Sequence, residues 1–149
     1  MKWLWAAYRR GVFKDTARFP EGLDTFQFQN TVLQFLADLF ERHGEAWVAI
    51  GKTERGEIPI GFAVGTPGEH RHLETHIFWF PEASPRNKLE CALKWLVDMK
   101  TDWRIDIWAR EGSWKFFDHL CKYGVLRPVG KYKDFDGSDA MFYQGVRKT

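Results

Sequence analysis

Apolar residues recur every three or four positions between Asp24 and Gly44, which is the period of an α-helix with one buried face. Asp24 followed by Gln27 resembles a capping box, so we expect the helix to begin there. Gly44 can end the helix, because glycine adopts the left-handed conformation at little cost. The expected buried face consists of Phe28, Val32, Phe35, Leu36, Leu39 and Phe40.

Alternating and continuous apolar runs predict three strands after this helix. Residues 58–64 carry an apolar side chain at every second position, which is typical of a half-buried strand. A polar turn separates them from the apolar run 47–50, which we expect to be a buried strand. The sequence HRHLETHIFWF is the third strand, and Pro81 ends it.

A helix and another strand follow. Ser84 and Pro85 suit the N-cap and the first helical position. The expected buried side of this helix is Leu89, Ala92, Leu93, Leu96 and Val97. The sequence WRIDIWA alternates again, and a strand–helix–strand unit favours parallel pairing of its two strands.

The last part of the chain predicts a helix and a hairpin. Ser113 is expected to cap the helix, and Asp136-Gly137 lies between two strand-like segments, as in a β-hairpin turn. Neither repeats nor linkers interrupt the 149 residues, a length that fits one domain. The pattern therefore predicts a single α/β domain with a mixed sheet over residues 1–149.

The first 20 residues are ambiguous. The spacing of their apolar side chains suits a peripheral helix, but a first strand is equally defensible. Their basic residues indicate either a solvated face or a patch that binds an anion or a partner. These residues are Lys2, Arg9, Arg10, Lys14 and Arg18.

Composition excludes disorder and makes a nucleic-acid partner unlikely. Eight Trp and thirteen Phe supply ample apolar surface for a core. The net charge is only +2, and no nucleic-acid recognition motif is present. Cys91 and Cys121 lack metal-binding spacing and suit small core residues in a reducing compartment. No apolar run reaches membrane-spanning length, so we expect a cytoplasmic protein with no membrane partner.

The order of these elements resembles that of the GNAT family of acetyl-CoA-dependent N-acetyltransferases. The resemblance covers residues 22–147 and is most specific from Glu74 to Tyr143. It implies a mixed, mostly antiparallel sheet of about six to seven strands with flanking helices. It also implies acetyl-CoA as cofactor, and a small-molecule or protein amine as acceptor.

The phosphate-binding loop of the family begins with Arg or Gln, and Gly and then Gly or Ala follow at fixed positions. This chain has the sequence Arg86-Asn87-Lys88-Leu89-Glu90-Cys91, in which Arg86 matches and Leu89 replaces the first glycine. Glycine there lets a pyrophosphate approach the backbone, and a leucine side chain obstructs that approach. The resemblance assigns cofactor binding to Arg86, Asn87 and Lys88, and to backbone amides near Phe78 and Phe80.

The resemblance also implies catalytic groups. Glu74 occupies the place of the family's base, and His76 shares its strand face and titrates nearer neutral pH. Phe116-Phe117 stands where the family has an aromatic residue followed by the tyrosine that acts as acid. Tyr123 is the nearest replacement, while Tyr132 and Tyr143 are weaker ones.

Three histidines and a glutamate alternate in the third predicted strand: His70, His72, Glu74 and His76. A His-x-His pair on one strand face can chelate zinc, but no second cluster of ligands supports a metal site. Polar side chains on the open face of a strand are the simpler interpretation, and we expect no metal.

Two functions remain open from the sequence. The first is an N-acyltransferase, with activity weakened by the missing glycine and tyrosine. The second is a non-catalytic protein of the same fold. The segment from Phe116 to Gly145 resembles the ends of small GNAT-like bacteriophage proteins, which implies virion or head assembly with phage structural proteins as partners. Surplus aromatic residues would then form protein–protein contacts in the host cytoplasm or the virion.

Overall fold

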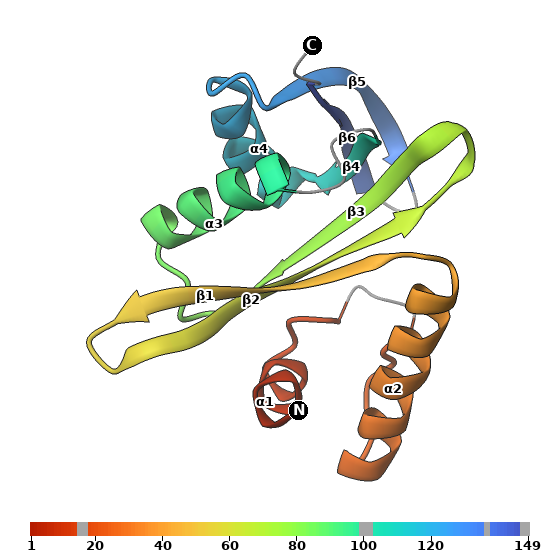
Figure 1. Ribbon diagram of the computed structural model, residues 1–149, viewed down its shortest axis with the longest axis vertical. Helices are drawn as coiled ribbons and strands as arrows, with labels where there is room; N and C mark the ends of the chain where they lie inside the picture. The colour runs from red at the N-terminus through yellow and green to blue at the C-terminus, as the bar shows by residue number, and fades with distance from the viewer. Residues whose placement is uncertain (15–17, 99–102, 136–137, 147–149) are drawn as a thin grey trace. The chain divides into compact units, whose positions relative to one another are not determined.

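The computed structural model describes residues 1–14, 18–98, 103–135 and 138–146. The chain forms two compact units. Unit 1 comprises Met1–Thr66 and Ile77–Ser84, and unit 2 comprises Pro67–His76 and Pro85–Thr149. Each unit has its own helices and strands, and strand β3 contributes residues to both (Figure 1).

The strands form a six-stranded sheet in the order β1-β2-β3-β4-β6-β5. Their bounds are β1 Glu45–Thr53, β2 Gly56–Pro67, β3 His72–Trp79, β4 Arg104–Arg110, β5 Leu126–Phe135 and β6 Ser138–Gly145. β1 pairs with β2, β4 with β6 and β5 with β6 in antiparallel fashion, whereas β3 and β4 are parallel. The predicted mixed, mostly antiparallel sheet with flanking helices is confirmed.

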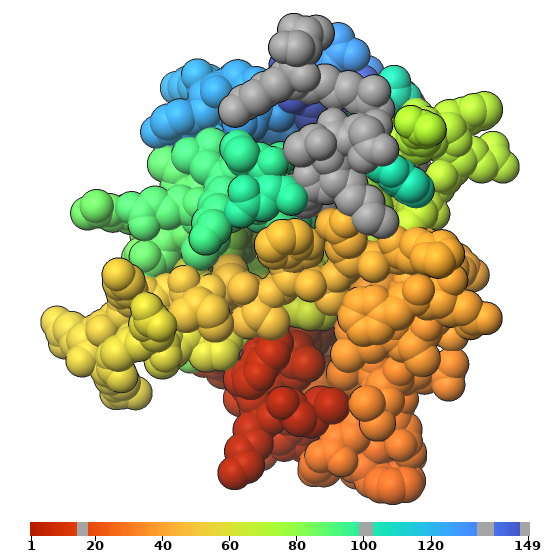
Figure 2. All heavy atoms as spheres, in the orientation of Figure 1, coloured from red at the N-terminus to blue at the C-terminus, as the bar shows by residue number. Residues whose placement is uncertain are grey.

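Unit 1 combines two helices, α1 Lys2–Arg9 and α2 Thr25–Glu41, with β1 and β2. Residues 2–9, which the sequence left ambiguous, are helical. Figure 2 shows α1, in red, lying beside α2, in orange. Their facing sides build an aromatic core whose buried members are Leu4, Ala7, Phe13, Phe19, Phe28, Val32 and Phe80.

Helix α2 begins as predicted and ends differently. Asp24 accepts a hydrogen bond from the Gln27 amide, and the Gln27 side chain accepts one from the Asp24 amide, which completes the capping box. At the other end, His43 adopts the left-handed conformation with φ of 59°, so the prediction for Gly44 was wrong. Glycine is still required at 44, because a Cβ there would lie 2.3 Å from Cδ1 of Leu39.

Strand β1 is the edge of the sheet, and its apolar run is not buried as predicted. Trp47, Val48 and Ile50 are all exposed. Apolar runs suit central strands, but periodicity alone does not tell an edge strand from a central one. The apolar run therefore predicted the strand correctly, but its predicted burial was wrong.

Gly61 on β2 allows two strands of unit 1 to approach closely. A Cβ at this position would lie 2.6 Å from Cε3 of Trp79 and 2.9 Å from the carbonyl oxygen of Phe78. The indole ring of Trp79 therefore occupies the space that any side chain at position 61 would need.

The basic amino-terminal segment is partly neutralised inside unit 1. The guanidinium of Arg10 forms a two-pronged ion pair with the carboxylate of Glu82. Arg18 pairs with Asp38 at 3.3 Å. Hydrogen bonding to Arg10 lowers the pKa of Glu82, and the same bond raises the pKa of Arg10.

Unit 2 contains helices α3 Pro85–Asp98 and α4 Trp114–Cys121, with short 3₁₀ turns at Glu69–Arg71 and Glu111–Ser113. Helix α3 starts at Pro85 as expected, but Trp95 is buried and Val97 is 46% exposed, so the buried side is rotated from the predicted one. Ser113 makes no side-chain capping bond to α4. The predicted turn Asp136-Gly137 lies outside the described residues.

Pairing between the parallel strands β3 and β4 is short. It runs from His72 opposite Arg104 to Thr75 opposite Ile107. Beyond Ile107, β4 continues to Arg110 and is paired there only with β6 among the described residues. Across the described part of the chain, none of the helices is long and apolar enough to span a membrane.

Candidate functional site

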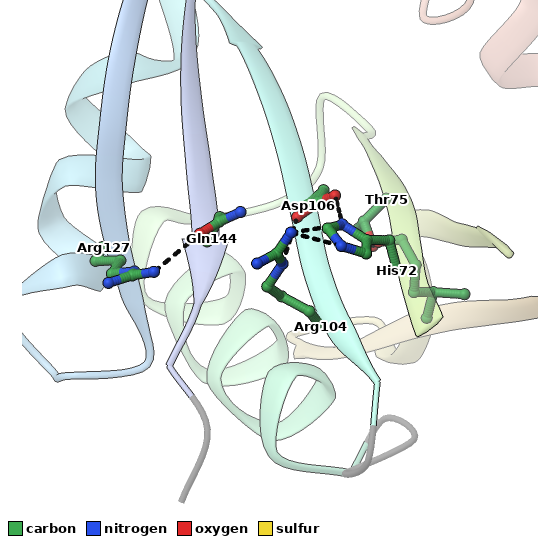
Figure 3. Close-up of polar contacts among 7 residues, drawn as sticks. His72, Thr75, Arg104, Asp106, Arg127 and Gln144 are labelled. Atoms are coloured by element: carbon green, nitrogen blue, oxygen red, sulfur yellow. Dashed lines mark hydrogen bonds and ion pairs between the residues drawn. The ribbon is translucent and has the colours of Figure 1, made fainter. Parts of the chain in front are cut away.

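The sheet of unit 2 has one apolar face and one polar face. Leu73, Ile105, Ile107 and Tyr143 are buried on the apolar face. The alternate positions place His72, Arg104, Asp106, Arg127 and Gln144 on the other face, because successive strand residues point to opposite sides. The register sets Gln144 opposite both Asp106 and Arg127, so polar side chains run across the strands (Figure 3).

His72 is held between a carboxylate and a guanidinium. Its Nδ1 contacts Oδ2 of Asp106, and its Nε2 contacts Nη2 of Arg104. Figure 3 shows both partners turned toward the imidazole ring. Guanidinium groups only donate, so Nε2 of His72 accepts from Arg104. The ring hydrogen is then on Nδ1, which donates to Asp106. The three side chains therefore fix one another's orientation. Asp106, which contacts both of the others, is the most buried of them, with 14% of its side chain exposed.

Arg104 and Arg127 border a pocket of about 440 Å³ on this face. His70, His72, Gly145 and Val146 complete its lining. Nη2 of Arg127 donates to the side-chain oxygen of Gln144 at 3.0 Å. Nε of Arg104 is buried and has no hydrogen-bond partner among the described residues.

Glu74 and His76, the predicted bases, lie together on β3. Nε2 of His76 is 3.4 Å from Oε1 of Glu74, and about half of each side chain is exposed. An exposed carboxylate with one histidine neighbour is accessible to an incoming amine. The structure thus brings these two predicted residues into contact, although their catalytic role stays a prediction.

Two tyrosines near α4 differ in environment. Tyr143 is fully buried, and its hydroxyl donates to Oδ1 of Asp118 at 2.8 Å. Burial and the Asp118 bond raise the pKa of Tyr143 well above its usual range. Tyr123 follows the helix, is 52% exposed, and lies edge-on to His119 with 5.6 Å between ring centroids. Of these two, Tyr123 is the one accessible from solvent; Tyr132, the third candidate, is 48% exposed and packs against Trp108.

The predicted phosphate-binding residues occupy the first turn of α3. Arg86 is 87% exposed, and its Nε donates to Oε1 of Glu90 at 2.9 Å. Asn87, Lys88 and Leu89 are half-buried. Amide hydrogens at the start of a helix carry partial positive charge, so an anion is favoured at this turn.

Phe78 and Phe80 lie in unit 1. Phe80 is buried in the aromatic core, and its amide donates to the carbonyl oxygen of Ile60 at 2.9 Å. The ring of Phe78 packs edge-on against Phe13 with a centroid distance of 5.1 Å. The Phe80 amide is therefore already engaged by Ile60, and the role of backbone amides near Phe78 and Phe80 as donors to a cofactor stays a prediction.

The alternating histidines divide among different partners. His72 pairs with Asp106, His76 with Glu74, and His70 with Glu69 at 4.0 Å. Within the residues that the structure describes, no three His, Cys, Asp or Glu side chains are grouped to hold a metal ion. Cys91 and Cys121 are half-buried and form no disulfide among the described residues, and burial raises the pKa of both thiols.

Sequence reasoning missed the contact of His72 with Arg104 and Asp106, and it missed Arg127 and Gln144 altogether. A signal was present, since Arg104 and Asp106 interrupt an otherwise apolar strand at alternate positions. Placing them beside His72 required the register of the parallel pair, which the alternation does not supply.

No family model and no curated protein matches the sequence. Solved structures do match. A chimera of spermidine N-acetyltransferase SpeG from Vibrio cholerae and hSSAT is 14% identical, with a TM-score of 0.60 over 93% of this chain and 89% of that chain. A GNAT-family acetyltransferase from Bacillus anthracis is 17% identical, with a TM-score of 0.54 over 89% and 80%. One from Bacillus cereus is 12% identical, with a TM-score of 0.55 over 78% and 79%.

At these identities the likeness concerns the fold. The resemblance implied the mixed, mostly antiparallel sheet with flanking helices, and the strand–helix–strand pattern predicted the parallel β3–β4 pair. The chain therefore has the fold of the GNAT-family acetyltransferases.

Proposed function

We propose that this protein transfers an acetyl group from acetyl-CoA to a primary amine. The observation that carries the proposal is the parallel β3–β4 ladder, which ends after four residue pairs, with a helix start at Pro85 between the two strands in sequence. The matching solved structures are named as acetyltransferases, and SpeG is named for spermidine. Small amines are therefore the acceptors to test first, with protein amines next.

The first turn of α3 supports the pyrophosphate-binding part of the proposal. Arg86 and Lys88 add two positive charges to the positive end of the helix dipole. The Arg86 guanidinium is bound only to exposed Glu90 among the described residues, and an anion can displace such a surface pair at small cost. Leu89 is half-buried beside this turn, which limits how closely a phosphate approaches the backbone.

Glu74 is assigned as the base of the reaction. An amine is mostly protonated near neutral pH, and it attacks only after losing a proton. The Glu74 carboxylate takes that proton, directly or through a water molecule. Nε2 of His76 lies 3.4 Å from Oε1 of this carboxylate. Acetyl-CoA would supply the thioester carbonyl carbon that the neutral amine attacks, so that the new C–N bond replaces the C–S bond.

Tyr123 is assigned as the acid, because its side chain is 52% exposed whereas the Tyr143 hydroxyl donates to Asp118. The protonated amine loses two protons in all: Glu74 passes one to solvent, and the other replaces the proton that Tyr123 gives to the departing sulfur. Two half-buried cysteines without a disulfide among the described residues fit a reducing compartment, and we assign the protein to the cytoplasm.

Calorimetric titration of the full chain with acetyl-CoA tests the proposal. We expect saturable binding, weakened by about 1–3 kcal/mol in Arg86→Ala, since one charged hydrogen-bond donor is lost. Arg55→Ala on the β1–β2 turn removes an equal charge from unit 1 and is the matched control. Absence of heat at millimolar acetyl-CoA would refute cofactor binding, and unchanged affinity in Arg86→Ala would refute the assignment of Arg86.

A second candidate is a non-catalytic role in virion or head assembly of a bacteriophage. Exposed apolar side chains of unit 1 favour it: Phe26, Leu33 and Phe40 recur every seven residues along α2. Apolar side chains at this spacing share one helix face, as in protein–protein contacts. Sedimentation with capsid or tail proteins, lost on Leu33→Glu, would support this role, and turnover by a freely soluble monomer would refute it.

A further inference from the structure

The pocket of about 440 Å³ on the polar face of unit 2 has the size of a small-molecule site. It lies where β4 and β5 begin and β6 ends, and its lining includes two arginines and two histidines. No carboxylate lines it within the described residues. A concave surface with this charge balance attracts anions.

The two guanidinium groups have hydrogen-bond donors left over. Each offers five N–H donors in a rigid plane. Arg127 donates to Gln144, and it has no carboxylate within ion-pair distance among the residues described. Nε of Arg104 is buried 3.8 Å from Oδ1 of Asp106, so this nitrogen belongs to that ion pair. Both arginines nevertheless line the pocket, so an oxyanion that enters it is stabilised by their positive charge and by their other N–H groups.

The neighbours of the arginines orient them. Gln144 holds one edge of Arg127, and the His72 ring, itself bound to Asp106, holds one edge of Arg104 (Figure 3). A guanidinium fixed on one edge presents its other edge to a planar or tetrahedral oxyanion, with two N–H groups in parallel. Such preorganisation limits the entropy lost on binding.

We propose that this pocket binds the oxyanion group of a small molecule, a carboxylate or a phosphate, through Arg104 and Arg127. The proposal does not depend on acetyl transfer, because it rests on the pocket and its donors alone. The oxyanion has two possible sources. It is either a free anion or the acidic group of the acceptor amine, since Glu74 lies about 7 Å along β3 from His72, on the same face.

Titration of the full chain with inorganic phosphate at constant ionic strength tests the site. The readout is the set of arginine Nε–Hε signals in a proton–nitrogen correlation spectrum. We expect two of these signals, assigned to Arg104 and Arg127 by Arg→Lys variants, to shift and saturate together. Shifts that rise linearly with phosphate, or that occur equally at all arginines, would overturn the proposal.

Variants sharpen this test. Arg127→Ala should weaken phosphate binding at least tenfold, the effect of about one lost charge-assisted hydrogen bond. Arg55→Ala, an exposed arginine of unit 1, should leave it unchanged. Far-ultraviolet circular dichroism checks folding, and Arg127→Lys serves if Arg127→Ala does not fold. Equal phosphate affinity in Arg127→Ala and Arg55→Ala contradicts the site.

Steady-state kinetics with two acceptors distinguishes the sources of the oxyanion. One acceptor is an amino acid, and the other is an amine of similar length without a carboxylate. If the acceptor's own acid occupies the pocket, Arg127→Ala raises KM about tenfold for the amino acid only. If a free anion occupies it, Arg127→Ala weakens phosphate binding at least tenfold but changes neither KM. If neither amine is acetylated, the proposed function fails, whereas the phosphate titration still decides the pocket.

Discussion

The two compact units bury and expose different kinds of side chain. Unit 1 buries aromatic rings that contact one another, such as Phe28 with Tyr8 at 4.7 Å between centroids. Its strand β1 and helix α2 expose apolar side chains. Unit 2 buries one face of its sheet and carries charged groups on the other, where His72, Arg104 and Asp106 contact one another. Unit 1 thus buries mainly aromatic rings, whereas unit 2 brings a histidine, an arginine and an aspartate into contact on its sheet.

Charged groups on the face of a sheet contribute little to the free energy of unfolding. Partly buried ion pairs lose hydration about as much as they gain attraction, so their worth to the fold is small. Nε of Arg104 and Oδ1 of Asp106 lie 3.8 Å apart, and both are buried without a hydrogen bond among the described residues, so this pair adds little to the stability of unit 2.

The largest expected effect is on the rate of acetyl transfer, which should depend on unit 2 and not on the matched position in unit 1. Glu74→Gln should lower the rate of acetyl transfer by about 10²- to 10⁴-fold, because the amide cannot accept the amine proton. Glu57→Gln on β2, an exposed glutamate of unit 1, is the matched control and should leave the rate unchanged. Steady-state rates with acetyl-CoA and a small amine measure both.

Equal rates in the Glu74→Gln and Glu57→Gln variants would show that Glu74 is not the base. The His76→Ala variant tests the second candidate for this role. A larger loss in His76→Ala than in Glu74→Gln would transfer the role of base to the histidine.

The next effect concerns the stability of unit 1. Phe28→Ala should lower the free energy of unfolding by about 3–5 kcal/mol, because a buried ring leaves a cavity among Trp5, Tyr8 and Phe19. Phe26→Ala, on the same helix but 71% exposed, should change it by less than about 0.5 kcal/mol. Urea unfolding measures the difference. Similar losses in the two variants would mean that α2 packs with another face.

The smallest effect tests the core of unit 2. Tyr143→Phe should cost about 0.5–1.5 kcal/mol at neutral pH, since the bond to Asp118 is lost. Burial raises the pKa of Tyr143, so above pH of about 10 the unfolded chain releases this proton while the folded chain keeps it. The free energy of unfolding should therefore fall more steeply with rising pH in the wild type than in Tyr143→Phe.

Denaturant curves between neutral and alkaline pH measure that slope. Tyr123→Phe is the control, because Tyr123 is half exposed. A wild-type slope equal to that of Tyr143→Phe would show that the Tyr143 hydroxyl ionises as freely as one in water.

Local signals predicted much of the fold. The capping box at Asp24, the helix start at Pro85 and the alternation of β4 rely on neighbours within a few residues, and each appears in the structure. Burial was less predictable. Ile50 is exposed on an edge strand and Trp95 is buried in α3, because both depend on which elements lie alongside, which periodicity does not encode.

The candidate site divides in the same way. Glu74 and His76 share a strand face by alternation, so their contact follows from local geometry. His72 and Asp106 are 34 positions apart and meet only through the register of β3 with β4. Arg127 and Gln144 belong to a different strand pair again, and no spacing in the sequence connects them with His72.

The close approach at Gly61 has a consequence for evolution. Because the Trp79 ring fills the place of a Cβ at position 61, a side chain at 61 would overlap with the ring. Related sequences should keep glycine at 61 wherever a large aromatic residue stands at 79. A smaller residue at 79 would remove the ring contact, but the Phe78 carbonyl oxygen at 2.9 Å would still oppose a side chain at 61. Relatives should therefore retain glycine at 61 even where position 79 varies.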